Sequence, residues 1–291
     1  MALMSKSDLL VIPSGGPLGA EIRGIDVSRP LDDASFQAIH DAWIEHLVLV
    51  FRDQRLTDRQ LMAFSRRFGE LHVVDPSVMD YDRRLAEDFP EIDVISNIVV
   101  DGVPMGALGA GEASWHTDMS MYEIPASAAL LYAIEIPPSG GNTRFANMYL
   151  AYEALPEELR RRVDGRRSIH DIAYTATGAV RKGFQSFNDK SQGPGARHPV
   201  VRTHAVTKRK SLYLGRQGYG YILGLPVEES DVLLVELWSY MTRPGIIWEH
   251  QWRVGDLVIW DNRCALHSRG AFDPAARRLL HRTTVKGERP E

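Results

Sequence analysis

The chain has 291 residues and a formal net charge of −4, with 44% hydrophobic and 25% charged residues, which is the composition of an ordinary globular protein. This slightly acidic balance does not favour binding to nucleic acid or to an anionic membrane surface. The single cysteine, Cys264, excludes a disulfide framework within one chain, and without a signal-peptide pattern or an apolar run of about 18 residues we expect a soluble, cytoplasmic protein with no membrane contact.

Strand and helix patterns alternate in the N-terminal part. Residues 18–27 alternate in hydrophobicity, which is typical of a strand. Residues 32–47 begin with two aspartates and continue with apolar residues at helical spacing, which predicts a helix. Residues 47–51 are an apolar run that predicts a short buried strand. Residues 57–60 match a capping box, so we expect a second helix there that ends at Gly69.

Strand patterns dominate the rest of the chain. Two segments, residues 101–113 and 174–198, lack a period, and loops of this length within a domain are often lids. No βαβ alternation is apparent, so we expect a single domain over residues 1–291, mainly β with flanking helices, as a β-sandwich or jelly roll. The other expected elements are strands at 92–100, 128–137, 210–215, 255–262 and 279–287, a strand running into a helix at 143–163, and an amphipathic helix at 228–242.

The stretch "ASWHTDMSMY" places His116 two residues before Asp118. On a strand these two side chains would project to the same side. An imidazole and a carboxylate on one face suit a metal site, and two histidines with one carboxylate are typical of non-haem Fe(II) oxygenases. With ten histidines and 38 acidic residues in 291, about one such pair is expected by chance. The alternative is a hydrogen-bonded His–Asp pair without a metal.

His267 is the best candidate for a third ligand, because it follows a strand and a turn in "VGDLVIWDNRCALH". Arg278 and Arg282 come after it, four residues apart and so on one face of a strand. Buried arginines on one face are costly unless they meet anions, and a guanidinium binds a carboxylate through two parallel hydrogen bonds. These arginines therefore indicate acidic ligands. The alternative is a solvated basic edge.

The motifs "WHTD", "PPSGGNTRFANM", "VGDLVIWDNRCALH" and "RRLLHRTTV" together resemble the taurine dioxygenase/2,4-dichlorophenoxyacetate dioxygenase family. "LGAEIRGIDVSRPLDD" and "RFGELH" extend the resemblance over nearly the whole chain. Members of this family are Fe(II)- and 2-oxoglutarate-dependent oxygenases with a double-stranded β-helix, a cupin-like jelly roll. The resemblance implies that O₂ and 2-oxoglutarate are used to hydroxylate a substrate, with succinate and CO₂ as coproducts.

The resemblance also assigns roles to individual residues. It implies that the iron ligands are His116, Asp118 and His267. It implies that 2-oxoglutarate is bound by Arg278 and Thr143, with Trp260 lining its pocket. Arg282 would contact the acidic group of the primary substrate. The loops at 101–113 and 174–198 would close over the site, and a homo-oligomer, a dimer or a tetramer, is expected.

The range of expected substrates is limited by two positions at which the sequence departs from the taurine dioxygenases. Val74 stands where they have a second histidine, and Glu112 where they have an asparagine. These departures argue against taurine itself, and "WHTDMSMYEIPASA", "PPSGGNT", "EALP" and "WDNRCALH" resemble the phenoxyacetate-degrading branch of the family more closely. We therefore expect an aryloxy or aromatic carboxylate, before an alkyl sulfonate or sulfate ester, and before an acid derived from a natural product or an amino acid. Two other classes stay open at this point, a zinc-dependent hydrolase with the same three ligands and a non-catalytic jelly-roll binding protein.

Overall fold

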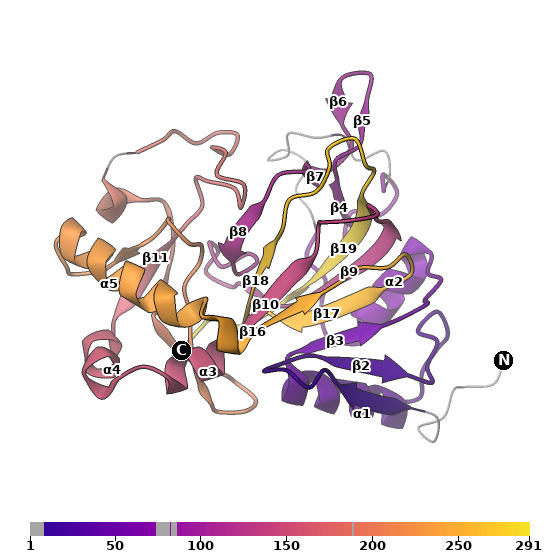
Figure 1. Ribbon diagram of the computed structural model, residues 1–291, viewed down its shortest axis with the longest axis horizontal. Helices are drawn as coiled ribbons and strands as arrows, with labels where there is room; N and C mark the ends of the chain where they lie inside the picture. Colours follow the sequence, from indigo (N-terminus) through magenta and orange to yellow (C-terminus); the bar gives the residue numbers. More distant parts are fainter. Residues whose placement is uncertain (1–8, 74–81, 83–85, 188) are drawn as a thin grey trace.

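The protein is described here by a computed structural model that covers residues 9–73, 82, 86–187 and 189–291. Most of its strands lie in two sheets (Figure 1). The larger sheet has eight strands, in the order β1 (Leu10–Pro13), β2 (Ala20–Arg23), β3 (Val48–Phe51), β17 (Leu257–Asp261), β9 (Ala126–Glu135), β19 (Leu279–Lys286), β4 (Asp93–Ser96) and β7 (Ala107–Leu108).

The smaller sheet has four strands, in the order β16 (Ile247–His250), β10 (Thr143–Asn147), β18 (Ala265–Arg269) and β8 (Ala113–His116). The two sheets pack face to face, because buried side chains of both form one apolar cluster, including Val50, Leu131, Phe145, Val258, Trp260 and Ala265. The described residues also form three small sheets. One contains β12 (Gly195–Pro199), β11 (Arg167–Asp171) and β15 (Tyr221–Ile222). The other two are the pairs β13 (Val201–Thr203) with β14 (Lys210–Leu212), and β5 (Val99–Val100) with β6 (Val103–Pro104).

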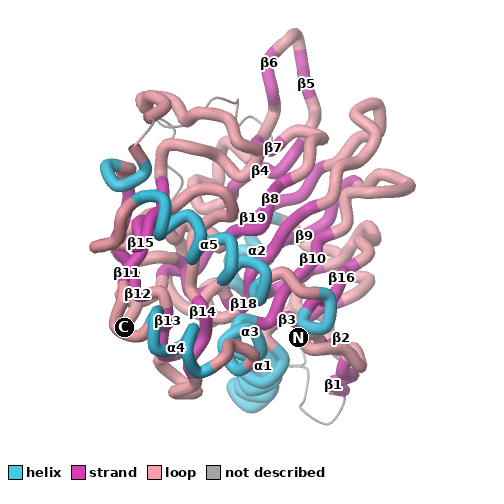
Figure 2. Tube along the Cα trace, turned by 60° about the vertical axis from the view of Figure 1, so that its left-hand side comes forward, coloured by secondary structure: helices cyan, strands magenta, loops and turns pink. Residues whose placement is uncertain are grey.

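Helices cover the outer faces of both sheets (Figure 2). α1 (Asp33–His46) and α2 (Asp58–Ser65) pack against the larger sheet. α3 (Met148–Glu153), α4 (Glu157–Val163) and α5 (Val227–Met241) pack over the smaller sheet. Short 3₁₀ turns occur at Lys190–Gln192 and Pro244–Ile246. No helix in the described part of the chain has both the length and the apolar character needed to cross a membrane.

Several elements confirm the local sequence signals. Asp32 caps α1 by accepting a hydrogen bond from the backbone N–H of Ser35. Both halves of the Thr57–Gln60 capping box are present at α2. This helix ends at Ser65, before the predicted Gly69, because the next turn tightens to 3₁₀ bonds, such as that from Phe68 N–H to Ser65 O. β3, β9, β17, β19 and α5 lie where strands or a helix were expected.

The predicted absence of any βαβ unit is wrong at one place, because β2 and β3 pair in parallel with α1 between them. The predicted strand at 92–100 is divided into β4 and β5. Asn97 interrupts it, since its side chain donates to the carbonyls of Pro274 and Ala276. Asp101 and Gly102 then adopt positive φ and form a two-residue hairpin turn.

The two segments expected to be loops contain short strands. Residues 101–113 include β6 and β7 and the first residue of β8, and residues 174–198 end in β12. These strands are too short to give a periodic pattern, so partners elsewhere in the fold decide them. The interval between Tyr174 and Asp189 is otherwise irregular where the structure describes it.

Candidate metal centre

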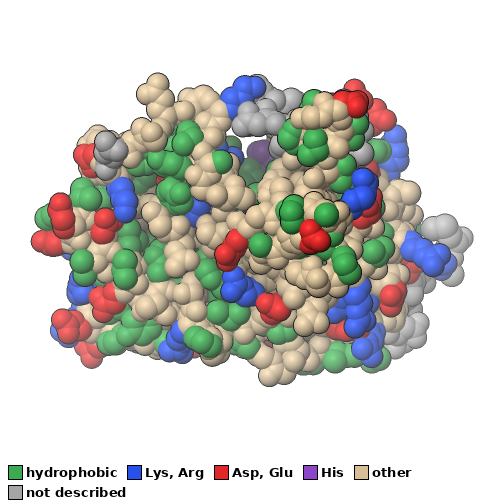
Figure 3. Space-filling model, turned by 45° about the horizontal axis from the view of Figure 1, so that its top comes forward, with side chains coloured by type: hydrophobic (Ala, Val, Ile, Leu, Met, Phe, Trp, Pro, Cys, Tyr) green, Lys and Arg blue, Asp and Glu red, His purple; other side chains and the backbone are tan. Residues whose placement is uncertain are grey.

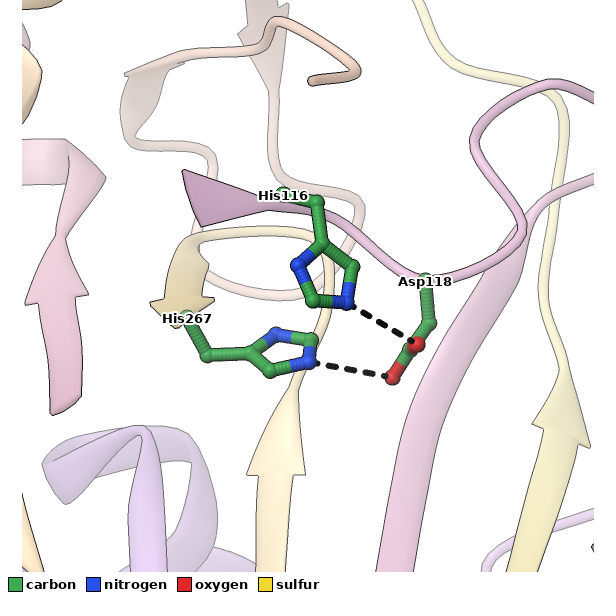
Figure 4. Close-up of side chains that lie close together, drawn as sticks. All are labelled: His116, Asp118 and His267. Atoms are coloured by element: carbon green, nitrogen blue, oxygen red, sulfur yellow. Dashed lines mark ion pairs between the residues drawn. The ribbon is translucent and has the colours of Figure 1, made fainter. Parts of the chain in front are cut away.

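His116, Asp118 and His267 meet between the two sheets (Figure 4). His116 ends β8 and pairs directly with His267 of β18, so their rings lie side by side with centroids 4.2 Å apart. The Asp118 carboxylate faces both rings. Its Oδ1 is 3.9 Å from His116 Nε2 and its Oδ2 is 3.7 Å from His267 Nε2. All three side chains are buried.

The position of Asp118 differs from the sequence expectation. It lies in a turn after β8 and not on the strand, so strand alternation does not bring it beside His116. The turn is fixed by two hydrogen bonds, from Thr117 N–H to Gly215 O (2.9 Å) and from Asp118 N–H to Asn262 Oδ1 (3.4 Å). His267 was expected at the end of a sheet. It lies within β18, paired with β10 on one side and β8 on the other.

The protonation of the three side chains suits a divalent cation. His116 Nδ1 lies 2.7 Å from the Ser114 carbonyl, which can only accept, so Nδ1 carries the proton and Nε2 offers its lone pair. Burial lowers the pKa of both histidines. Burial alone would raise the pKa of Asp118, but the charge and hydrogen bond of Arg282, together with the neighbouring His267 and His116, outweigh burial and the pKa is lowered. The cluster is therefore two neutral imidazoles and one carboxylate.

The spacing of these atoms also fits a metal. Asp118 Oδ2 is buried and has no hydrogen-bond partner among the described residues. Nitrogen and oxygen ligands lie about 2.1 Å from a divalent metal, so two of them can be up to about 4.2 Å apart. Both carboxylate–imidazole separations fall within that limit. A cation between the three side chains would satisfy an atom that the protein leaves without a partner.

Arg278 is a buried cation with no carboxylate partner in the part of the chain that the structure describes. It is 2% exposed, and its Nε and Nη1 have no hydrogen-bond partner among the described residues. Burial, with the nearby charge of Arg269, lowers its pKa to about 9. A Cβ at Gly141 would come 3.4 Å from Arg278 Nε, so the backbone of the Pro-Pro-Ser-Gly-Gly turn passes close to the guanidinium. An uncompensated buried guanidinium of this kind calls for an anion.

The other predicted cosubstrate residues are also buried. Thr143 of β10 accepts a hydrogen bond through Oγ1 from the indole of Trp252 (3.0 Å) and pairs across the sheet with Arg269. Trp260 of β17 donates to Asn262 Oδ1 (3.0 Å), and its ring lies 5.0 Å from that of His267. Trp260 therefore supports His267, while Asn262 holds both this indole and the backbone of Asp118.

Arg282 lies at the metal cluster but is already paired with carboxylates. Its Nη1 donates to Asp118 Oδ1 (2.9 Å) and its Nη2 to Asp93 Oδ2 (2.5 Å). The neighbouring His281 points to the opposite face of β19 and contacts Asp58 at 2.6 Å, as alternation along the strand predicts. Arg282 thus holds a candidate metal ligand in position. Its contact with the substrate stays a prediction.

Arg269 is a site residue that the sequence reasoning missed. It is buried on β18, two residues after His267, and donates to the carbonyls of Gly109 (2.9 Å), Leu108 (3.3 Å) and Gly111. It therefore clamps the glycine-rich segment. Arg269 could have been found from the sequence because it lies two residues after the candidate ligand His267, and residues i and i+2 of a strand share a face.

Replacing Arg269 with methionine should loosen residues 108–111 and raise the 2-oxoglutarate concentration at half-saturation by about tenfold, because a bound anion at Arg278 would lose the second positive charge beside it. Hydrogen exchange of the segment and a 2-oxoglutarate titration measure the two effects. Arg253→Met, at an exposed position, is the control. Unchanged exchange in residues 108–111 would contradict the clamp.

A second buried cluster, His204, Asp261 and Cys264, also has metal-ligand atoms close together. Its polar atoms already have partners. Asp261 accepts two hydrogen bonds from Arg263 (2.8 and 2.7 Å), and His204 Nε2 lies 3.0 Å from its Oδ2. His204 Nδ1 accepts from two backbone N–H groups. Burial raises the pKa of Cys264 well above its usual value, so its thiol stays protonated. This cluster is a structural ion-pair network.

Replacing Asp261 with alanine should therefore cost about 3–5 kcal/mol of unfolding free energy, because it leaves the Arg263 charge buried and unpaired. Burial opposes ionisation of Asp261, but Arg263 and His204 lower its pKa. Its contribution is complete above the unfolded-state pKa of about 3.9 and is lost as the pH falls towards the folded-state value. Urea unfolding at neutral pH measures the loss. Glu157→Ala, at an exposed position, should change stability little, and an equal effect of both variants would refute the network.

Comparisons with known proteins agree over most of the chain. Residues 11–284 match the family described as taurine catabolism dioxygenase TauD, TfdA family. An alpha-ketoglutarate-dependent 2,4-dichlorophenoxyacetate dioxygenase of Burkholderia sp. (strain RASC) is 35% identical over 278 residues, which cover 92% of this chain and 91% of the relative. An alkylsulfatase of Acinetobacter baylyi is 34% identical over 286 residues, 94% of this chain and 83% of the relative. The crystal structure of a taurine dioxygenase from Burkholderia xenovorans superposes with a TM-score of 0.79 at 32% identity and covers 97% of this chain and 91% of that one.

Proposed function

The chain belongs to the taurine catabolism dioxygenase TauD, TfdA family, and from that premise we propose that it hydroxylates a small aryloxy or aromatic carboxylate. It is an Fe(II)- and 2-oxoglutarate-dependent dioxygenase that uses O₂ and forms succinate and CO₂. The zinc hydrolase and the binding-protein alternatives are set aside by this membership. The observation that carries the proposal is the buried His–Asp–His cluster, together with the buried Arg278, whose Nε and Nη1 have no hydrogen-bond partner among the described residues.

The iron is held, in this proposal, by His116, Asp118 and His267. Support comes from the unpartnered Asp118 Oδ2 and from the His116 tautomer, which presents Nε2 to the cluster. When bound, the iron supplies the redox chemistry that couples oxidation of 2-oxoglutarate to hydroxylation of a C–H bond. The protein's own contribution is placement. Arg282 and Asn262 orient Asp118, and Trp260 packs against His267.

The 2-oxoglutarate is held through its distal carboxylate by Arg278 and the hydroxyl of Thr143, with Trp260 as part of the pocket wall. The buried, unpartnered guanidinium of Arg278 supports this assignment, since a carboxylate there would match its charge and its donors. Arg269, whose charge lies near Arg278, clamps residues 108–111, which supports a position of the glycine-rich segment beside the same anion. This favours the segment 101–113 as a closure over bound 2-oxoglutarate.

The primary substrate is a small organic acid, and Arg282 contacts its acidic group. An aryloxy carboxylate is favoured by the 35% identical 2,4-dichlorophenoxyacetate dioxygenase. An alkyl sulfonate or sulfate ester is the second candidate, and the alkylsulfatase relative favours the sulfate ester. Val74, used above against taurine, lies outside the described residues, while Glu112 is exposed and pairs with Arg144 at 3.2 Å.

The finer architecture is a double-stranded β-helix over residues 1–291, with the eight-stranded and four-stranded sheets as its two walls. The face-to-face packing of two mainly antiparallel sheets supports it. Closure of residues 174–198 over the site, a dimeric or tetrameric assembly and a cytoplasmic location stay predictions.

The test is anaerobic addition of Fe(II) and 2-oxoglutarate, followed by O₂ and a panel of acids. A weak visible charge-transfer band is expected on chelation, and succinate formation should be stimulated by aryloxy carboxylates more than by sulfate esters. A band without any stimulating acid would refute the substrate class. The absence of both band and succinate would refute the metal and cosubstrate assignments.

A further inference from the structure

Arg216 lies directly beside the metal cluster. Its backbone forms a β-bridge with His116. The flanking hydrogen bonds run from Thr117 N–H to Gly215 O (2.9 Å) and from Gln217 N–H to Trp115 O (3.0 Å). The segment 215–217 therefore follows the end of β8 into the turn that carries Asp118. Its charge lowers the pKa of His116, which also indicates that the two side chains are close.

Arg216 and Arg181 converge on one backbone carbonyl. Arg216 Nη1 and Arg181 Nε (3.3 Å) both donate to the carbonyl of Tyr174. Arg216 is buried, and its Nε has no hydrogen-bond partner among the described residues. Burial and the charge of Arg181 lower its pKa to about 10. Two guanidinium groups that share a neutral acceptor leave most of their positive charge uncompensated.

The carboxylates near this pair do not neutralise it. Asp118 and Asp93 are both paired with Arg282. Asp171 accepts a hydrogen bond from Tyr174 N–H (3.0 Å), and burial raises its pKa. No ion pair joins Arg181 or Arg216 to a carboxylate within the described ranges. Among the described residues, Arg282 is thus paired with two carboxylates, while Arg181 and Arg216 are paired with none.

Aromatic rings lie close to Arg216 and to the carbonyl that both arginines share. The rings of Tyr174 and Tyr219 lie 4.6 Å apart, and Phe187 lies 5.7 Å from Tyr174. The Arg216 guanidinium is 6.0 Å from the Tyr219 ring. Figure 3 shows a hollow in the surface with a histidine on its floor and Lys or Arg side chains beside it. Positive charge next to aromatic rings suits an anion that carries an aromatic group.

We propose that Arg181 and Arg216 form an oxyanion subsite that binds the acidic group of the primary substrate together with Arg282, while Tyr174 and Tyr219 contact its aromatic part. This inference rests on the proposed dioxygenase function and deepens it. It explains why the buried Arg216 and the half-buried Arg181 have no carboxylate partner among the described residues, since the substrate supplies the missing anion. It also makes Arg181 and Arg216 determinants of the charge that a substrate must carry.

The test compares Arg181→Gln and Arg216→Gln with the wild-type protein loaded with Fe(II) and 2-oxoglutarate. The probes are phenoxyacetate, its neutral analogue phenoxyethanol, and hexyl sulfate. Each substitution should raise the phenoxyacetate concentration for half-maximal succinate stimulation at least about tenfold and reduce the preference over phenoxyethanol. The 2-oxoglutarate concentration that half-saturates the anaerobic charge-transfer band should stay within about twofold of the wild-type value.

The control is Arg197→Gln, at an exposed arginine of β12, which should leave all these values unchanged. Thermal unfolding checks that each variant is folded, and Arg181, being only half-buried, keeps the test valid if Arg216→Gln does not fold. Unchanged responses to phenoxyacetate and hexyl sulfate in Arg181→Gln would overturn the subsite, as would an equal loss of 2-oxoglutarate affinity.

The probes also separate this inference from the function on which it rests. A wild-type protein with the band but no response to either acid would refute the subsite together with the substrate class. A wild-type protein with neither band nor succinate would refute the proposed function itself. A shift of the hexyl sulfate response alone would confirm the oxyanion subsite and reassign the substrate from carboxylates to sulfate esters.

Discussion

Replacing Asp118 with alanine should abolish substrate-dependent succinate formation and weaken Fe(II) binding at least about 100-fold, more than residues that only orient ligands usually contribute. Asp118 is the only carboxylate of the cluster in the described part of the chain and the point where both imidazoles meet. Its loss would leave two neutral nitrogens to bind a dication. It would also leave Arg282 with less compensating charge beside the site.

The measurement is Fe(II) titration under anaerobic conditions, with Mn(II) as a redox-stable substitute, together with the succinate assay. His116→Ala should behave like Asp118→Ala. Glu123→Ala, which removes an exposed carboxylate paired with Arg289, is the matched control. If both cluster variants retained wild-type metal affinity, the three residues would not be the metal ligands.

Replacing Arg278 with methionine should raise the 2-oxoglutarate concentration at half-saturation by about two orders of magnitude, because truncating one partner of a buried charge pair costs about 2–5 kcal/mol. The same change should not destabilise the unliganded protein, since methionine removes a buried cation that has unpartnered donors. These opposite expectations separate binding of the cosubstrate from a structural role.

Thermal unfolding with and without 2-oxoglutarate provides the second readout. The Fe(II)-loaded wild-type protein should be stabilised by 2-oxoglutarate, while Arg278→Met should gain little at the same concentration. Arg277→Met is the matched control, because Arg277 is the adjacent residue and its ion pair with Glu135 is exposed. A rise in the KM of the primary substrate alone would mean that Arg278 and Arg282 have exchanged the roles assigned to them.

Local sequence signals predicted many of the elements because they depend on neighbouring residues. The caps at Asp32 and Thr57 and the apolar runs of β3, β9 and β17 are satisfied by contacts within a few positions or by burial as such. Several short strands were not predicted by such local signals. β7, β11 and β12 have few residues each and owe their extended form to partners more distant in the sequence.

The sequence by itself determined the chemical composition of the site. It singled out His116, Asp118 and His267, the two arginines that follow them, and through their motifs the family and its cofactors. The tertiary structure decided which charged side chains have a partner of opposite charge. Asp118 reaches the histidines from a turn, and Arg282 is paired with two carboxylates. Only the structure indicated roles for three further arginines, because these roles follow from the hydrogen-bond partners that Arg269, Arg181 and Arg216 have or share among the described residues. The physical reason is that the cost of burying a charge depends on every group around it in space, and a single sequence lists those groups without their distances.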